Sequence, residues 1–224
     1  MNLTQSTPQS REATYIPFQS APSREAAVAS LLRGAAGLVR STEPATLQWL
    51  ALRIDSSRFA IADFFAEEAG RAAHFAGQVA AALKQAAPQA VEGGWEDGVV
   101  AHVENSKVLA YAVNGNDPAQ AKLATRIEIK ALPGKAGELA ALLTGAGAVI
   151  RSSEPGTLLW YAIRLDADRF AIFDVFADEA GRAAHFAGHV AAALKGKALD
   201  LVEGGWEAGV VAKIRNSEVL SATW

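Results

Sequence analysis

Two aspartates in this sequence are placed where a carboxyl group could act as a base. Asp63 stands within the apolar stretch RFAIADFF, and Asp174 holds the same place in RFAIFDVF. On a strand, each shares a face with Phe and Ile side chains. Desolvation there would raise the carboxyl pKa toward that of a general base, unless an arginine such as Arg53 or Arg164 pairs with it. The alternative is a structural carboxylate bonded to backbone or arginine near the strand end.

Two histidines follow these aspartates at the same interval. His74 and His185 fall about one turn into an expected helix, and an imidazole transfers protons well near neutral pH. A packed helix histidine is the alternative. His189 lies four residues after His185, which predicts one shared helix face. An HxxxH pair can bind a metal, but no HExxH glutamate or third ligand accompanies it, so no metal site is predicted.

Aromatic and cationic side chains near these groups could bind a substrate. Large aromatics are usually core residues, and a wall on which a substrate stacks is the alternative for each tryptophan. Arg164 or Tyr161 could stabilise an anion, although strand alternation puts them on opposite faces. The predicted substrate-binding residues are Tyr161, Trp160, Phe176, His189, Arg164 and Trp206.

The chemistry-bearing residues recur because the chain contains one sequence twice. The segment that starts at Glu43 returns at Glu154 without a gap, with roughly 55 identities over about 100 aligned positions. We expect two similar domains, residues 14–113 and 125–224, with a linker at 114–124 and a flexible tail at 1–13.

The two copies differ at several positions where a pocket is expected. The second copy is the richer in polar groups, so it is the expected active one if only one functions. It has Arg126, Tyr161, Phe173 and His189 where the first copy has Tyr15, Leu50, Ala62 and Gln78.

Each copy predicts the order strand, helix, strand, strand, helix, strand. In the second copy the expected strands are 125–131, 157–165, 169–176 and 219–224, the helices are 136–151 and 178–195, and 199–215 forms helical turns. This is the ferredoxin-like βαββαβ order of an α+β fold. The hairpin strands are apolar on both faces, and helices cover only one. We therefore expect the two domains to pack sheet to sheet as a pseudo-dimeric α+β barrel.

Composition excludes several classes of function. The 224 residues include 21 basic and 24 acidic side chains, for a net charge of −3, and no basic block stands out. We expect no nucleic acid or membrane partner. The absence of cysteine excludes disulfides, a thiolate nucleophile and iron–sulfur clusters. No signal peptide or long apolar segment is visible, so a cytoplasmic protein is expected.

Several short segments together resemble a known family. They are EPGTL at 154–158, FAIFDVFADEA at 170–180 and AH at 184–185, with counterparts in the first copy from Glu43 onward. The pattern resembles the antibiotic biosynthesis monooxygenase (ABM) domain, including its quinol monooxygenase branch, over nearly the whole chain outside the tail and linker. Such domains typically dimerise through their sheets, so a tandem copy implies an intrachain pseudo-dimer, with a further homodimer left open.

The resemblance also implies a reaction. A small aromatic phenol or quinol is oxygenated by dioxygen with no metal or organic cofactor, because the deprotonated substrate itself reduces dioxygen. The protein then has to bind a flat ring, remove a proton and stabilise the anion in a dry pocket between sheet and helices. ABM members commonly carry a histidine at the place of His74 and His185.

The fold that the resemblance implies also serves two other kinds of function. The haem-degrading branch has an Asn on its first strand and a Trp at the end of its third, where this chain has Phe65 and Phe176. Haem oxygenation is therefore disfavoured. The remaining alternative is a non-catalytic small-ligand-binding or stress-response barrel, in which pockets are filled and Asp174 lies apart from His185.

Overall fold

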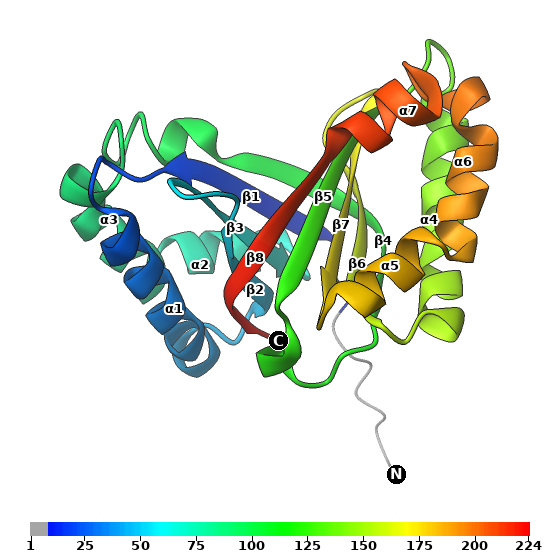
Figure 1. Ribbon diagram of the computed structural model, residues 1–224. Helices are drawn as coiled ribbons and strands as arrows, with labels where there is room; N and C mark the ends of the chain where they lie inside the picture. The colour runs from blue at the N-terminus through cyan, green and yellow to red at the C-terminus, as the bar shows by residue number, and fades with distance from the viewer. Residues whose placement is uncertain (1–8) are drawn as a thin grey trace.

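The computed structural model describes residues 9–224, and its strands form one closed antiparallel barrel with helices on the outside (Figure 1). The barrel order is β1-β3-β2-β8-β5-β7-β6-β4. The strands are β1 (Glu12–Gln19), β2 (Thr46–Arg53), β3 (Arg58–Phe65), β4 (Glu104–Val113), β5 (Leu123–Lys130), β6 (Thr157–Arg164), β7 (Arg169–Phe176) and β8 (Ile214–Thr223). The helices are α1 (Glu25–Thr42), α2 (Glu68–Phe75), α3 (Gln78–Ala90), α4 (Ala136–Ser153), α5 (Glu179–Phe186), α6 (His189–Leu201) and α7 (Gly205–Gly209).

The last strand of each copy belongs to both copies. β4 pairs with β1 of its own copy through residues 104–107 and with β6 of the other copy through residues 107–113. β8 likewise pairs with β5 and then with β2. The expected pseudo-dimer of two ferredoxin-like units is confirmed, and the two sheets are also joined edge to edge. Every described strand therefore has two neighbours, and none offers an open edge for aggregation.

The strands are apolar on both faces because they separate three cores. Inside the barrel, Phe64 stacks on Tyr161 with ring centroids 3.6 Å apart. On the outer faces, Trp49 packs under α1 and α3, and Trp160 packs under α4 and α6. Figure 1 shows these two helix groups on opposite sides of the barrel. Each site histidine therefore lies between a sheet and its own helices, away from the barrel interior.

The structure corrects the predicted tail and linker. Residues 1–8 of the predicted tail lie outside the described residues, but Ser10 is buried and β1 already begins at Glu12. The predicted linker contains the 3₁₀ turn η2 (Pro118–Gln120), and β5 begins inside it at Leu123. Backbone pairing and burial extend these strands beyond the span that alternation alone indicates.

The helix expected over 178–195 is also wrong. Two helices, α5 and α6, replace it, and Gly188 separates them in an extended conformation. A Cβ at Gly188 would lie 2.6 Å from Glu154 Oε1, so any other residue at this position would have to displace the carboxylate. The segment 199–215 contains the end of α6, then α7 and the 3₁₀ turn η3 (Val211–Lys213). None of the helices within residues 9–224 is long and apolar enough to cross a membrane.

The buried hydroxyl of Tyr161 makes a testable contribution to barrel stability. It donates to Gln48 Oε1 at 2.5 Å, and burial raises the Tyr161 pKa above its ordinary value. Tyr161→Phe will lower the free energy of unfolding by about 1 kcal/mol, because the partly buried Gln48 amide oxygen loses one of its two donors and keeps only Ser10. Urea denaturation measures this, with Tyr111→Phe as the control. Equal stability of the two variants would contradict the assignment.

Candidate functional site

A row of polar side chains crosses the helix-facing side of the first sheet, one from each of four strands. Asn105, Thr14, Asp63 and Trp49 are register neighbours on β4, β1, β3 and β2. Thr14 Oγ1 donates to Asn105 Oδ1 at 2.9 Å, which turns the amide nitrogen of Asn105 away from Thr14. The second copy repeats the row with Asn216, Thr125, Asp174 and Trp160.

A histidine from the short helix after β3 lies above this row, between two carboxyl groups. His74 Nδ1 is hydrogen-bonded to Glu43 Oε2, and His74 Nε2 lies 3.5 Å from Asp63 Oδ2. All three side chains are buried. Glu43 follows the end of α1, and His74 is in α2, so the elements on either side of the β2–β3 hairpin bring them together.

The second copy reproduces this arrangement. His185 Nδ1 lies 2.6 Å from Glu154 Oε2, and His185 Nε2 lies 3.7 Å from Asp174 Oδ1. These side chains are buried as well. The chain thus contains two Glu–His–Asp groups with the same order and nearly the same geometry.

The glutamate of each group fixes the tautomer of its histidine. A carboxylate accepts hydrogen bonds, so the nitrogen that faces Glu43 carries the proton and the Nε2 of His74 carries the lone pair. Glu43 Oε1 also faces the backbone N–H of Val79 at 3.4 Å, in the first turn of α3, where helix geometry favours negative charge. A Cβ at Gly77 would lie 2.5 Å from this oxygen, so the glycine leaves room for the carboxylate.

The buried carboxyl groups of the two aspartates have the least favourable electrostatic environment in the site. Neither oxygen of Asp63 or Asp174 has a hydrogen-bond partner in the described part of the chain. Burial raises the pKa of each to about 6, the neighbouring histidine opposes this rise, and the glutamate beyond it adds to the rise. The indole N–H of Trp49, the cross-strand neighbour of Asp63, is also buried and has no partner among residues 9–224. Such groups cost stability and are common at functional sites.

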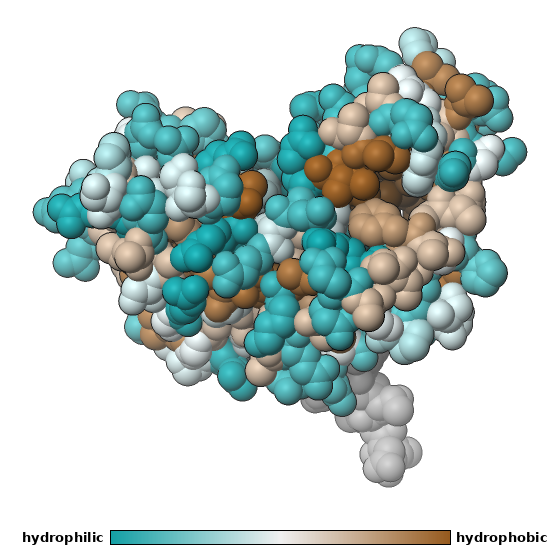
Figure 2. Space-filling view, viewed as in Figure 1, coloured by the Kyte–Doolittle hydropathy of each residue, from teal (hydrophilic) through white to brown (hydrophobic). Residues whose placement is uncertain are grey.

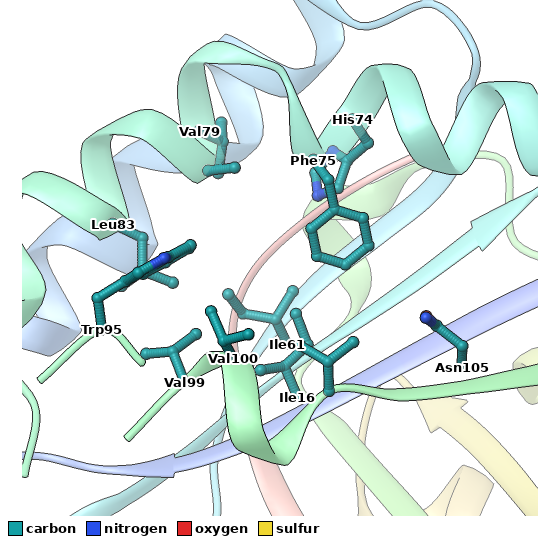
Figure 3. A pocket seen from close by; sticks show the side chains of 12 residues that line it. Ile16, Ile61, His74, Phe75, Val79, Leu83, Trp95, Val99, Val100 and Asn105 are labelled. Carbon is teal, nitrogen blue, oxygen red and sulfur yellow. The ribbon is translucent and has the colours of Figure 1, made fainter. Parts of the chain in front are cut away.

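A cavity of about 380 Å³ opens beside His74 (Figure 3). Figure 3 shows Phe75 and His74 along one wall, Trp95 at one end and Asn105 at the other, with the Asn105 amide nitrogen directed into the space. The rest of the lining is apolar: Ile16, Ile61, Val79, Ala80, Leu83, Val99, Val100 and Val103. A partly open apolar cavity with few polar groups is typical of a small-molecule site.

The second copy has nearly the same lining residues, with Ile214 in place of Val103. Figure 2 shows an apolar hollow beside α7 on this copy, within a largely hydrophilic face. A groove of about 440 Å³ between α4 and α6 includes His189 and shares Ile172, Val190 and Leu194 with this lining. Among residues 9–224, no group of three or more His, Cys, Asp or Glu side chains is arranged to hold a metal ion.

Comparisons with known proteins identify the fold. No protein-family model matches the sequence, and no curated protein matches it. A candidate monooxygenase from Fusobacterium nucleatum subsp. nucleatum matches with a TM-score of 0.77 and 17% identity, over 96% of this chain and 95% of that one. A candidate monooxygenase from Lactobacillus acidophilus matches with a TM-score of 0.76 and 10% identity, over 96% of each chain. The chain has an ABM-like fold. An anthrone oxidase-like protein matches with a TM-score of 0.57 and 10% identity, over 96% of this chain and 93% of that one.

Within this ABM-like fold, the structure brings four of the predicted site residues together. Asp174 and His185 face each other between sheet and helices, and Trp160 adjoins Asp174 in the polar row. The ring of Phe176 lies 5.5 Å from that of His185. The first copy places Asp63 beside His74 in the same way.

Other predicted residues lie elsewhere in the ABM-like fold. Tyr161 faces the barrel interior, so it cannot stabilise an anion beside His185. His189 begins a separate helix and is exposed in the α4–α6 groove, so the expected shared face with His185 is wrong. Arg164 lies over Phe170 and donates to Ala167 O at 3.4 Å, with no contact to Asp174.

The remaining predicted residues also have contacts that do not involve the buried aspartates. Trp206 is half-buried against the second helix–sheet core, with Lys195 over its ring. Arg53 pairs with Glu218 at 3.4 Å, so neither predicted arginine neutralises a buried aspartate. Arg126 and Phe173 line the barrel interior. Like Tyr161, they lie on the barrel side of the sheet, and His189 is exposed in the α4–α6 groove, so the polar difference between the copies does not mark the second site.

Sequence reasoning missed the glutamates and the asparagines. Glu43 and Glu154 begin the repeated EP motif, and that identity was the available signal. Asn105 and Asn216 occur in an identical Asn-Ser pair near the start of the last strand of each copy. Their site role depends on pairing with β1 and β5, which no local pattern indicates.

Proposed function

We propose that the protein is a cofactor-independent monooxygenase that oxidises a small electron-rich aromatic, a phenol or quinol, with dioxygen. The observation that carries this proposal is the buried Glu43–His74–Asp63 group beside an apolar cavity. The fold, shared with candidate monooxygenases and an anthrone oxidase-like protein, agrees with it.

The cavity can hold a flat ring with its hydroxyl toward the polar groups. Trp95 and Phe75 offer aromatic surfaces, and Asn105 offers an amide donor for the oxygen that becomes negative. His74 Nε2 accepts the hydroxyl proton, and Glu43 stabilises the imidazolium that results. The second copy has the same groups in His185 and Glu154 and their neighbours.

The reaction balances without an added reductant. The bound anion gives electrons to dioxygen, and a new bond forms between a ring carbon and oxygen. The hydroperoxide then loses the hydrogen on that carbon, the O–O bond breaks, and water leaves. A hydroquinone plus dioxygen thus yields a hydroxyquinone plus water. The protein's contribution is proton acceptance, anion stabilisation and exclusion of bulk water.

The non-catalytic alternative predicts filled pockets and an aspartate distant from its histidine. The cavity of about 380 Å³ and the 3.5 Å separation between His74 and Asp63 favour the catalytic proposal. Oxygen uptake by chelator-treated protein, measured with a panel of hydroquinones and polycyclic phenols, tests it. We expect uptake with at least one class. Silence across the panel, or uptake only after iron, haem or flavin is added, would overturn the proposal.

A further inference from the structure

A polar pocket of about 460 Å³ adjoins the His74 cavity, and Asn105 lines both spaces. The two copies build it together. The first copy supplies Glu12, Glu68, Arg71, Ser106 and Lys107, and the second supplies the turn between β6 and β7 at residues 164–167. A substituent on a ring bound in the cavity would therefore extend past Asn105 into charged surroundings.

Three acidic and three basic side chains line this pocket, and all except Arg164 are paired, including Asp166, which bonds Arg169 at 2.6 Å. Arg71 is buried and bonds Glu12 at 3.0 Å and Glu68 at 2.5 Å, while Lys107 also bonds Glu12. Arg164 differs, because no carboxylate in residues 9–224 lies within 4.0 Å of its guanidinium. Its described contacts are the Phe170 ring and one backbone carbonyl, so most of its N–H donors are available.

The pseudo-symmetric position in the other copy lacks this free cation. Arg53 corresponds to Arg164, and its guanidinium lies 3.4 Å from Glu218. Glu218 stands where the first mouth has Lys107. The arginine at the mouth of the second site is therefore paired with a carboxylate, whereas the arginine at the mouth of the first is not. Two nearly identical catalytic groups thus face entrances that differ in whether a guanidinium is available.

We propose that the polar pocket binds an anionic ring substituent, such as a carboxylate, and that Arg164 makes the first site selective for acidic phenols or quinols. The reaction of such substrates rests on the proposed function, whereas the binding preference does not. A guanidinium pairs with a carboxylate through two parallel hydrogen bonds, which suits it to recognise such a group. Arg164 comes from the second copy, so the first site is complete only in the pseudo-dimer.

Anaerobic calorimetric titration of the full chain tests this preference without turnover. The probes are 2,5-dihydroxybenzoate and its neutral methyl ester. The Arg164→Gln variant should weaken binding of the acid about tenfold and of the ester less than twofold, since only the acid uses the guanidinium. The matched control Arg53→Gln, at the mouth of the second site, should leave binding of the acid at the first site unchanged. Added salt should reduce the preference for the acid.

Three results would overturn the assignment: no preference of the wild type for the acid, equal weakening of both probes by Arg164→Gln, or an equal effect of Arg53→Gln. Urea denaturation of Arg164→Gln establishes that any loss is not unfolding. If the wild type consumes no oxygen, the proposed reaction fails, while the titration still decides whether Arg164 recognises an anion.

Discussion

Replacing the buried aspartates with asparagine will flatten the dependence of stability on pH. Burial raises the pKa of Asp63 and Asp174 to about 6, so the native protein keeps both protons at pH values where the unfolded chain releases them. Their contribution to stability is present below the ordinary aspartate pKa and is lost as pH rises through about 6. As pH rises, each aspartate lowers the free energy of unfolding by about 3 kcal/mol in total, because its pKa is shifted by about two units.

The measurable form of this prediction is a difference between two pH values. From pH 4.5 to pH 7.5, Asp63→Asn should gain about 2 kcal/mol of unfolding free energy relative to the wild type, and Asp174→Asn the same. Urea titrations at both pH values give these numbers, and comparing pH values cancels any constant cost of the buried amide. The double variant should show about twice the change, because the two sites lie in separate cores.

Asp166→Asn is a control that should change the pH dependence of stability in the opposite direction. Asp166 is exposed, and its hydrogen bond with Arg169 lowers its pKa to about 2. Its contribution is present above the ordinary aspartate pKa, so the variant should lose a little stability at neutral pH relative to acid. Parallel pH profiles for the wild type and Asp63→Asn would show that the aspartate is not desolvated in solution.

Replacing both site histidines with glutamine will reduce oxygen uptake by roughly 10²-fold or more, the usual scale of general acid–base catalysis. Each single variant, His74→Gln or His185→Gln, leaves the other copy intact. With an acidic substrate, His74→Gln should remove most of the activity, because Arg164 serves the first site. With a neutral substrate, the two single variants should lose comparable shares. Initial rates of oxygen consumption per folded protein measure each loss.

His189→Gln separates catalysis from a general effect of losing imidazole. His189 is exposed in the α4–α6 groove, so its replacement should leave uptake unchanged. Circular dichroism of every variant reports the folded fraction. Wild-type rates in the double variant, or a fall in activity that only follows the folded fraction, would return both histidines to a packing role.

The fold was predictable because its strongest signals are local and repeated. Strand alternation with apolar residues on both faces indicated two covered surfaces, and the internal repeat supplied the second sheet. The position of Asp174 and His185 beside one sheet–helix cleft followed from the strand face and the first turn of the next helix, although their contact did not. These inferences depend on short segments, where a side chain's direction is set by its own backbone.

The remaining features depend on contacts distant in sequence. Glu154 contacts His185 and lies against Gly188 at the break between α5 and α6, and that break was hidden in a helix-forming stretch. Arg164 serves the other copy's site because β4 joins β6 beside it. The greater number of polar residues in the second copy also did not identify its pocket, because Tyr161 is polar but lies in the barrel interior.

The pairing of each copy's last strand with the other copy has a consequence for biosynthesis. β2 finds its second neighbour only in residues 218–223 of β8, where Trp49 pairs with Thr223. A nascent first copy on the ribosome therefore presents β2 as an unpaired edge until nearly the whole second copy has emerged. Such an edge can recruit a strand from another chain. Protein cut short before residue 218 should accordingly associate or aggregate, even though its first catalytic group is intact in sequence.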